Sequence, residues 1–272
     1  MLPPSDMGRS ILALIGVAVG ITAVAAQTGD QVTFPSGGLT LHGTLFKPAG
    51  DGPFPAVLYN HGGGGRVPEG PDAVTRFFTA NGYVFFMPHR RGHGRSAGLG
   101  TDLAGMTRDA RAAGRPIGKE FVRLHETEQL DDQLAALEYM AQLPYVDKSR
   151  IIIAGCSAGG IQTILSAERG TRARVGISFA GAAVSWKEMP ELQQRLRTAA
   201  RGAKVPLFIL QAENDVDTTP GRELGAELAR AGKPHQMKIY PPHPVGGHGP
   251  FCMDPGVWGA DVLAFIAKYS NR

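Results

Sequence analysis

The fold of this 272-residue chain is decided by the stretch Ile151-Ile152-Ile153-Ala154-Gly155-Cys156-Ser157-Ala158-Gly159-Gly160. A fully apolar, β-branched run is typical of a strand that is buried on both faces, and residues 161–169 follow with helical spacing. Between them lies Gly-x-Ser-x-Gly, the pattern of a sharp turn that exposes a serine hydroxyl at the edge of a sheet. Glycines on both sides leave room for the strained backbone of such a turn. We therefore expect Ser157 to be a nucleophile.

A serine nucleophile needs a base, and the base needs a carboxylate to orient it. On this kind of turn the order along the chain is Ser, then Asp or Glu, then His. A strand expected over residues 206–211 leads into Glu213-Asn214-Asp215-Val216-Asp217. Asp215 is the preferred acid, with Asp217 and Glu213 as alternatives. Asp217 also suits a cap of the helix expected near residue 220.

Two histidines follow the last expected strand, in Pro241-Pro242-His243-Pro244-Val245-Gly246-Gly247-His248-Gly249. His248 is flanked by glycines, which let a loop bring the imidazole to the edge of the sheet. We expect His248 to be the base. His243 lies between prolines in a stiffer segment, and we interpret it as structural.

The negative oxygen that forms during acyl transfer needs two hydrogen-bond donors. The N–H of Ala158 is one candidate. The run His61-Gly62-Gly63-Gly64-Gly65 follows a strand expected over residues 56–60, so an amide of Gly62 or Gly63 is expected to be the second; a merely flexible loop is the alternative. No phosphate-loop Lys-Ser or Lys-Thr follows these glycines, and no dinucleotide turn is placed here, so no nucleotide cofactor is expected.

A basic segment, His89-Arg90-Arg91-Gly92-His93-Gly94-Arg95-Ser96, follows a strand expected over residues 83–88. Arg90 and Arg91, together with His61, are candidates for lining a substrate pocket that favours an anionic or carbonyl-rich substrate. The alternative is that the guanidinium groups anchor the loop to backbone carbonyls or acids. His89 and His93 have no companion cluster of carboxylates or thiolates, so no metal site is expected.

The chain has two cysteines, Cys156 and Cys252, too few for a disulfide scaffold or a four-thiolate metal site. If Ser157 points into the site, its neighbour Cys156 points away from it. We expect Cys156 to be a small buried side chain facing the core, and we expect no disulfide with Cys252, although an oxidising compartment would permit one.

Elsewhere, short strands alternate with helix-length segments, of which 126–143, 220–231 and 257–269 have helical patterns. This alternation predicts an α/β fold with a mainly parallel, doubly wound sheet flanked by helices. Only residues 96–123 fit neither period, and we interpret them as a lid or pocket wall, or as a plain surface excursion. The expected strands span residues 31–34, 40–46, 56–60, 83–88, 151–155, 175–179, 206–211 and 237–240.

Composition bounds the class of protein. Hydrophobic residues make up 43% and charged residues 19%, with 37 Gly and 20 Pro, which excludes a disordered chain or a coiled coil. The 28 basic residues exceed the 24 acidic ones, but they are scattered, so we expect no nucleic-acid partner.

The amino-terminal segment has the pattern of a secretory signal peptide. Arg9 precedes the apolar run 11–26, which ends in small residues before a polar stretch. We expect residues 1–26 to be cleaved, leaving a catalytic domain over 27–272 that is periplasmic or secreted and has no stable membrane insertion. An uncleaved segment would make the protein membrane-anchored.

Five ordered motifs now stand out: HGGGG at 61–65, RRGHGRS at 90–96, GCSAGG at 155–160, AENDVDTTP at 212–220 and GGHG at 246–249. Together they resemble the α/β-hydrolase fold, and more closely its dienelactone hydrolase-like branch, which is related to the catalytic domains of prolyl oligopeptidase-type peptidases. The resemblance covers roughly residues 32–269. It implies a nucleophile at Ser157, an acid at Asp215 and a base at His248.

Dienelactone hydrolases proper use a cysteine nucleophile, whereas the central position of the motif here is Ser157. This departure favours a serine esterase. We therefore expect a serine hydrolase that cleaves a small-molecule carboxylic ester through an acyl-enzyme, without a cofactor. One alternative is a peptidase or amidase of prolyl oligopeptidase type with the same triad. The other is a non-catalytic ligand-binding protein on the same fold.

Overall fold

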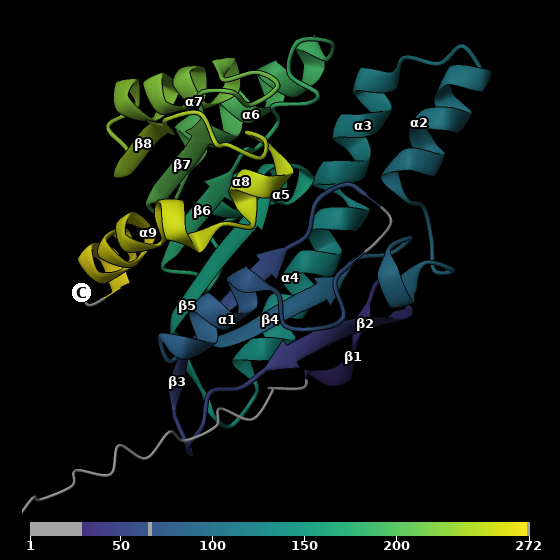
Figure 1. Ribbon diagram of the computed structural model, residues 1–272. Helices are drawn as coiled ribbons and strands as arrows, with labels where there is room; N and C mark the ends of the chain where they lie inside the picture. Colours follow the sequence, from purple (N-terminus) through teal and green to yellow (C-terminus); the bar gives the residue numbers. More distant parts are fainter. Residues whose placement is uncertain (1–28, 65–66, 271–272) are drawn as a thin grey trace, which may run out of the picture.

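The computed structural model describes residues 29–64 and 67–270, which form one eight-stranded sheet with helices on both faces (Figure 1). The strand order is β1-β2-β4-β3-β5-β6-β7-β8; the β1–β2 and β2–β4 pairs are antiparallel and the others are parallel. The predicted mainly parallel α/β sheet is thus confirmed. The strands are β1 (Asp30–Ser36), β2 (Leu39–Phe46), β3 (Phe54–Asn60), β4 (Val84–His89), β5 (Val146–Cys156), β6 (Val175–Phe179), β7 (Leu207–Ala212) and β8 (His235–Tyr240).

Helices cover the sheet in two layers. Helices α1 and α9 contact each other on one face, while α4, α5, α6 and α7 pack side by side on the other (Figure 1). The helices are α1 (Ala73–Ala80), α2 (Leu103–Ala112), α3 (Ile117–Glu126), α4 (Glu128–Ala141), α5 (Ala158–Arg169), α6 (Pro190–Gly202), α7 (Thr219–Arg230), α8 (Gly249–Cys252) and α9 (Pro255–Ser270), with a 3₁₀ turn at Gly94–Ser96.

The central strands are apolar on both sides because each side meets a different core. In β3, Val57 and Tyr59 join the cluster that contains Trp258 of α9, whereas Leu58 joins the cluster that contains Met140 of α4. Successive strand residues point to opposite faces, so a strand between two helical layers must be apolar throughout. The parallel strands then end at one edge, where the connecting loops meet.

Residues 96–123, expected to fit neither helical nor strand spacing, contain α2 and most of α3, which runs on to Glu126. Leu103, Met106 and Ala110 form the buried side of α2, and the Asp102 carboxylate caps its first turn by accepting a hydrogen bond from the Gly105 N–H. The expectation was wrong because α2 is short and its buried residues are separated by exposed Ala and Arg, which dilute the periodic signal.

Within residues 29–64 and 67–270, no helix combines the length and the apolar character that crossing a membrane would require. The signal peptide predicted over residues 1–26 lies outside the described residues.

Candidate active site

Ser157 lies in the turn between β5 and α5, with a φ of 57° and a ψ of −115°. A positive φ is costly for a residue with a side chain, so the surrounding structure must enforce it. The Ser157 N–H donates to the carbonyl of Phe179 over 2.9 Å. A Cβ at Gly159 would collide with the carbonyl of Asn60, and a Cβ at Gly155 would collide with the backbone of Gly159. The two glycines of the motif are therefore a steric requirement.

The side chains of Ser157, His248 and Asp215 form one hydrogen-bonded chain. His248 Nε2 lies 3.0 Å from Ser157 Oγ, and His248 Nδ1 lies 2.8 Å from Asp215 Oδ1. The Asp215 side chain is fully buried and also accepts hydrogen bonds from the Val216 N–H at 2.7 Å and from Gln211 Nε2 at 3.0 Å. Because a carboxylate can only accept, Nδ1 of His248 carries the proton and Nε2 is left to accept the serine hydroxyl.

The alternative acid and base residues lie elsewhere. Asp217 accepts a hydrogen bond from the N–H of Thr219, the first residue of α7, but the N-cap of that helix is Thr218, so Asp217 is not its cap. Glu213 is exposed. His243 is buried and contacts Asp254, with Nε2 3.2 Å from Oδ2, which agrees with a structural role.

Two backbone segments lie next to Ser157, the start of α5 and the glycine loop after β3. Ala158 is the first residue of α5, so its N–H has no partner within the helix and lies at the positive end of the helix dipole. The glycine loop after β3 faces this turn. A Cβ built on Gly62 would lie 3.8 Å from Ser157 Cβ, and one on Gly63 would lie 3.5 Å from Ala158 Cβ. The structure thus brings together all three predicted oxyanion residues.

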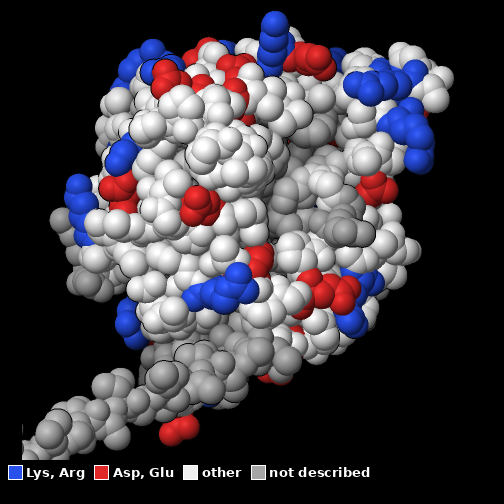
Figure 2. Space-filling model, viewed as in Figure 1, with Lys and Arg blue, Asp and Glu red and all other residues white. Residues whose placement is uncertain are grey.

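A cavity of about 590 Å³ opens beside Ser157. Its walls come from the glycine loop, α2, α3, the start of α5 and the loop after β6. The stretch 96–123 thus supplies a wall of the cavity. The face shown in Figure 2 carries mixed charges, with basic side chains gathered on the lobe that α2 forms in Figure 1. Residues that line the cavity include Leu103, Phe121, Ile161, Val184, Arg108 and Arg111.

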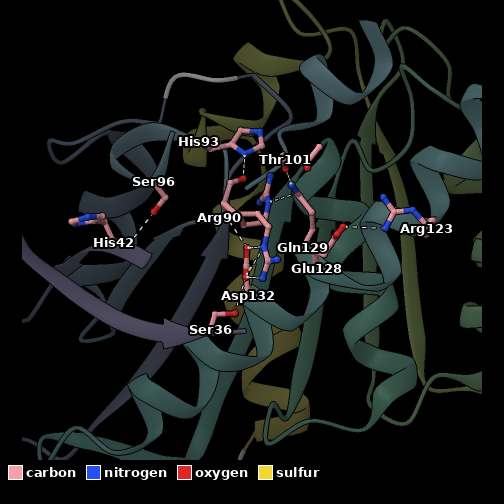
Figure 3. A network of polar contacts seen from close by, with 11 residues as sticks. Ser36, His42, Arg90, His93, Ser96, Thr101, Arg123, Glu128, Gln129 and Asp132 are labelled. Carbon is pink, nitrogen blue, oxygen red and sulfur yellow. Dashed lines mark hydrogen bonds and ion pairs between the residues drawn. The ribbon is translucent and has the colours of Figure 1, made fainter. Parts of the chain in front are cut away.

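The structure corrects the pocket interpretation of His61, Arg90 and Arg91, because none of these side chains lines this cavity. The chain turns inward directly after β4, toward α4, where Gln129 and Asp132 bind the two arginines (Figure 3). Arg90 is fully buried, and the Arg91 guanidinium pairs with Asp132 over 2.6 Å. The alternative interpretation, in which these groups anchor the loop, describes what the structure contains.

The histidines around Arg90 are held neutral. Burial, followed by the positive charge of Arg90, keeps the pKa of His61 well below its usual range and lowers the pKa of His125 to about 3. Burial also lowers the pKa of His89 to about 4. Among the described residues, no three His, Cys, Asp or Glu side chains gather in a way that would hold a metal ion.

Cys156 and Cys252 form a disulfide, so the expectation that they stay unpaired is wrong. Cys156 ends β5 and points away from the site, against the core under α9, as expected. Cys252 ends α8, the short helix that directly follows His248, and therefore lies at the same place, with the two Cα atoms 6.0 Å apart. The pairing was missed because the cysteines are 96 residues apart and only the triad geometry brings their segments together.

Comparison with known proteins agrees with this geometry. In sequence, the chain is 29% identical over 181 residues to an uncharacterized peptidase, YtmA, of Bacillus subtilis. The aligned region covers 64% of this chain and 62% of YtmA. The chain therefore spans less than two thirds of the length of that relative.

Solved structures share the fold at low identity. A putative dienelactone hydrolase from Klebsiella pneumoniae superposes with a TM-score of 0.64 at 19% identity, over 89% of this chain and 98% of that one. A puromycin-hydrolyzing peptidase from Mycobacterium tuberculosis superposes with a TM-score of 0.67 at 18% identity, and the match covers 93% of this chain and 42% of the peptidase. An acylaminoacyl peptidase from Pyrococcus horikoshii superposes with a TM-score of 0.62 at 19% identity, and the match covers 79% of this chain and 37% of the peptidase. The family model of the dienelactone hydrolases matches residues 41–256, most of the chain, and the protein therefore belongs to the dienelactone hydrolase family.

Proposed function

We propose that the protein is a serine hydrolase that cleaves a carboxylic ester through an acyl-enzyme. The observation that carries this proposal is the hydrogen-bonded chain from Ser157 Oγ through His248 to the buried carboxylate of Asp215, with links of 3.0 and 2.8 Å. A hydroxyl becomes an effective nucleophile only when a base is in hydrogen-bond contact with it and a third group orients that base. This arrangement supplies all three groups.

In the proposed reaction, His248 Nε2 takes the hydroxyl proton as Ser157 Oγ attacks the ester carbonyl carbon. The carboxylate of Asp215 stabilises the imidazolium, and the N–H groups of Ala158 and of Gly62 or Gly63 bind the negative oxygen. The carbon–oxygen bond to the alcohol then breaks, and His248 gives its proton to the departing alkoxide. Water attacks the acyl-enzyme with His248 again as base, which releases the carboxylic acid and restores Ser157.

Family membership and the cavity support an ester as the substrate. The family takes its name from an enzyme that opens a lactone, which is a cyclic ester. Leu103, Phe121 and Ile161 offer an apolar surface next to Ser157, whereas Arg108 and Arg111 add positive charge. This lining suits an acyl group with an apolar body, and an acidic substituent would be attracted to the arginines.

A direct test of the mechanism is labelling with a fluorophosphonate probe, followed by peptide mapping. We expect the label on Ser157, and we expect Ser157→Ala to abolish labelling and most hydrolysis of p-nitrophenyl butyrate, leaving about 10³–10⁴-fold acceleration over water. Ser149→Ala, at an exposed serine remote from the site, is the matched control. Labelling at another residue, or undiminished hydrolysis by Ser157→Ala, would refute the assignment. Tight ligand binding with no labelling would instead indicate a binding protein.

A peptidase or amidase is the second candidate, because two structural neighbours and the curated relative are named as peptidases. The same residues can cleave an amide, but the nitrogen leaving group is poorer and must be protonated as it departs. Rates on a p-nitrophenyl ester and on the anilide of the same acyl group separate the two candidates. We expect kcat/KM to favour the ester; a dipeptide anilide cleaved as fast as the ester would favour the peptidase.

We also propose that the protein works outside the cytoplasm. The disulfide between Cys156 and Cys252 supports this, because such bonds persist mainly in oxidising compartments. The signal-peptide pattern over residues 1–26 points to the same compartment. Mass spectrometry of the mature amino terminus tests the proposal: a start near residue 27 is expected, and an intact residue 1 would indicate a retained segment.

A further inference from the structure

Arg90 is an unusual residue in this fold, because its guanidinium is fully buried and forms no ion pair with any described carboxylate. A buried charge without a paired opposite charge is costly unless its donors are satisfied by well-placed acceptors. Three of its donors meet neutral oxygens: Nη1 donates to the carbonyl of His61 at 2.9 Å, Nη2 to the carbonyl of Gly62 at 3.1 Å, and Nε to Oε1 of Gln129 at 2.9 Å. Two of the three acceptors are consecutive carbonyls of the glycine loop.

The two carbonyls belong to the peptide units that carry the oxyanion donors. The His61 carbonyl shares a planar, trans unit with the N–H of Gly62, and the Gly62 carbonyl shares one with the N–H of Gly63. In such a unit the C=O and the N–H point in opposite directions. A guanidinium that holds both carbonyls on its own side therefore turns both N–H groups away from itself.

The glycine loop packs against the turn that carries Ser157. A Cβ built on Gly62 would lie 3.8 Å from Ser157 Cβ, and one built on Gly63 would lie 3.5 Å from Ala158 Cβ. Gly63 also lines the cavity together with Ser157. The N–H groups that Arg90 orients are thus those that the proposed mechanism uses.

His61 reinforces the same carbonyl. Its Nδ1 lies 2.8 Å from the carbonyl oxygen of Gly62, and its Nε2 accepts a hydrogen bond from the Arg90 N–H at 3.4 Å. A neutral ring with the proton on Nδ1 satisfies both of these contacts, and it agrees with a pKa far below the usual value. Arg90 Nη2 then lies 3.3 Å from Nδ1 without a hydrogen bond to it and donates to the Gly62 carbonyl instead. The Gly62 carbonyl therefore accepts two hydrogen bonds, one from His61 Nδ1 and one from Arg90 Nη2.

Helix α4 also binds the Arg90 guanidinium, through the side chain of Gln129. Gln129 is fully buried, accepts from Arg90 Nε and points its amide nitrogen to the carbonyl of Thr101 at 3.5 Å (Figure 3). One turn later, Asp132 binds Arg91 instead. The two adjacent arginines thus have separate partners: Arg91 ties the chain to α4, whereas Arg90 reaches the glycine loop.

A run of four glycines has many accessible backbone conformations, so the loop needs an external group to fix the direction of its amides. We propose that Arg90 is the positioning residue of the oxyanion hole, acting through the carbonyls of His61 and Gly62. The inference rests on the proposed serine hydrolase function, since it assigns Arg90 to the same site. Lysine, a point donor, can hold one carbonyl but cannot span two in a fixed fork.

The test compares Arg90→Lys and Arg90→Gln with the wild type, using p-nitrophenyl butyrate and phenylboronic acid. The boronate adds to the serine oxygen and places a negative oxygen in the oxyanion hole. We expect Arg90→Gln to lower kcat about 10²-fold with KM changed less than threefold, because only the transition state uses the amides. The affinity for the boronate should fall in parallel, and Arg90→Lys should lie between.

Arg91→Gln is the matched control, because it removes the neighbouring, partly buried arginine, whose guanidinium binds Asp132 and not the glycine loop. We expect this variant to lower the Tm while kcat and boronate affinity stay within twofold of the wild type. The inference is wrong if folded Arg90 variants keep both quantities within twofold, or if the Arg90 and Arg91 variants lose kcat equally. If the wild type is not labelled by a fluorophosphonate at Ser157, the proposed function fails instead.

If the Arg90 variants do not fold, a substitution at Gln129 provides a second test. Gln129→Met removes the acceptor of Arg90 Nε and leaves Arg90 itself unchanged, so the guanidinium loses one of the three contacts that fix its position. We expect kcat and boronate affinity to fall together by about fivefold, with KM unchanged. An unchanged boronate affinity in this variant would overturn the inference.

Discussion

His248 takes its orientation from one carboxylate, and that carboxylate is itself fixed on every side. Asp215 accepts hydrogen bonds from the imidazole, from the Val216 N–H and from the Gln211 side chain, and it is fully shielded from solvent. The imidazole, by contrast, is 23% exposed. Asp215, the proposed acid, is therefore held rigidly, and His248, the proposed base, is partly open to solvent.

Asp215→Asn is expected to lower kcat by about three to four orders of magnitude at neutral pH. The amide keeps the shape of the carboxylate but loses its charge and can present a donor to Nδ1, which favours the wrong tautomer and leaves the imidazolium unsupported. Steady-state hydrolysis of p-nitrophenyl butyrate measures the effect. Asp217→Asn, two residues along, should keep kcat within about twofold and leave stability nearly unchanged, because the Asn side-chain oxygen can also accept from the Thr219 N–H. If Asp217→Asn lowered kcat more than Asp215→Asn, Asp217 and not Asp215 would be the acid.

Single residues differ in how well their sequence context reveals them. The positions of Ser157, Asp215 and His248 were predictable, because the turn motif and the chain order assign each a role before any contact is known. The function proposed for Arg90 has no such signature. Its partners are backbone carbonyls and the side chain of Gln129, and neither leaves a spacing that distinguishes a buried anchor from a pocket residue.

At the scale of elements, the disulfide ties the strand that presents the nucleophile to the helix that follows the base. Cys156 directly precedes Ser157 at the end of β5, and Cys252 lies at the end of α8, whose first residue follows His248. The two cysteines are 96 residues apart in the sequence, and the bond joins the residue before Ser157 to the end of the helix that begins after His248. It therefore stabilises the fold and the position of the base together.

The double variant Cys156→Ala/Cys252→Ala is expected to lower the free energy of unfolding by about 2–4 kcal/mol, because the unfolded chain regains the freedom that the cross-link removes. We also expect a lower kcat, since α8 and His248 lose their tether. Thermal unfolding with and without dithiothreitol measures the stability change. Reductant should shift the Tm of the wild type toward that of the double variant and leave the double variant unchanged. A wild-type Tm that is insensitive to complete reduction would contradict the prediction.

At the scale of the whole molecule, the class of fold could be predicted from the sequence but the order of strands could not. Each strand could be predicted from its own residues, as β5 could from its apolar run and β7 from the mainly apolar residues 207–212. The position of β5 between β3 and β6 depends on pairings between distant segments, which single-strand patterns do not encode. The turn motif and the chain order of Ser, Asp and His implied that the loops after these strands meet, but not which strands lie side by side.

The buried histidines make the stability of the whole molecule depend on pH. In the folded state the pKa of His125 is about 3, that of His89 about 4 and that of His61 well below the usual value of 6.5. Above pH 6.5 both folded and unfolded chains keep these rings neutral, so the rings add no pH dependence. As the pH falls below 6.5, the unfolded chain binds protons that the folded chain excludes. Stability is therefore lost from pH 6.5 down to about pH 4 through His89 and down to about pH 3 through His125.

Each such histidine contributes a slope of about 1.4 kcal/mol per pH unit, so the three together give up to about 4 kcal/mol per unit. Urea unfolding at intervals from pH 7.5 to 4.5 measures this slope. His125→Gln should reduce it by about 1.4 kcal/mol per unit, because one proton fewer is taken up on unfolding. Phe121→Leu, whose ring centroid lies 4.5 Å from that of His125, should lower stability at every pH and leave the slope unchanged. If His125→Gln instead shifts the curve without flattening it, the acid sensitivity arises from other groups, such as the carboxylates paired with surface arginines.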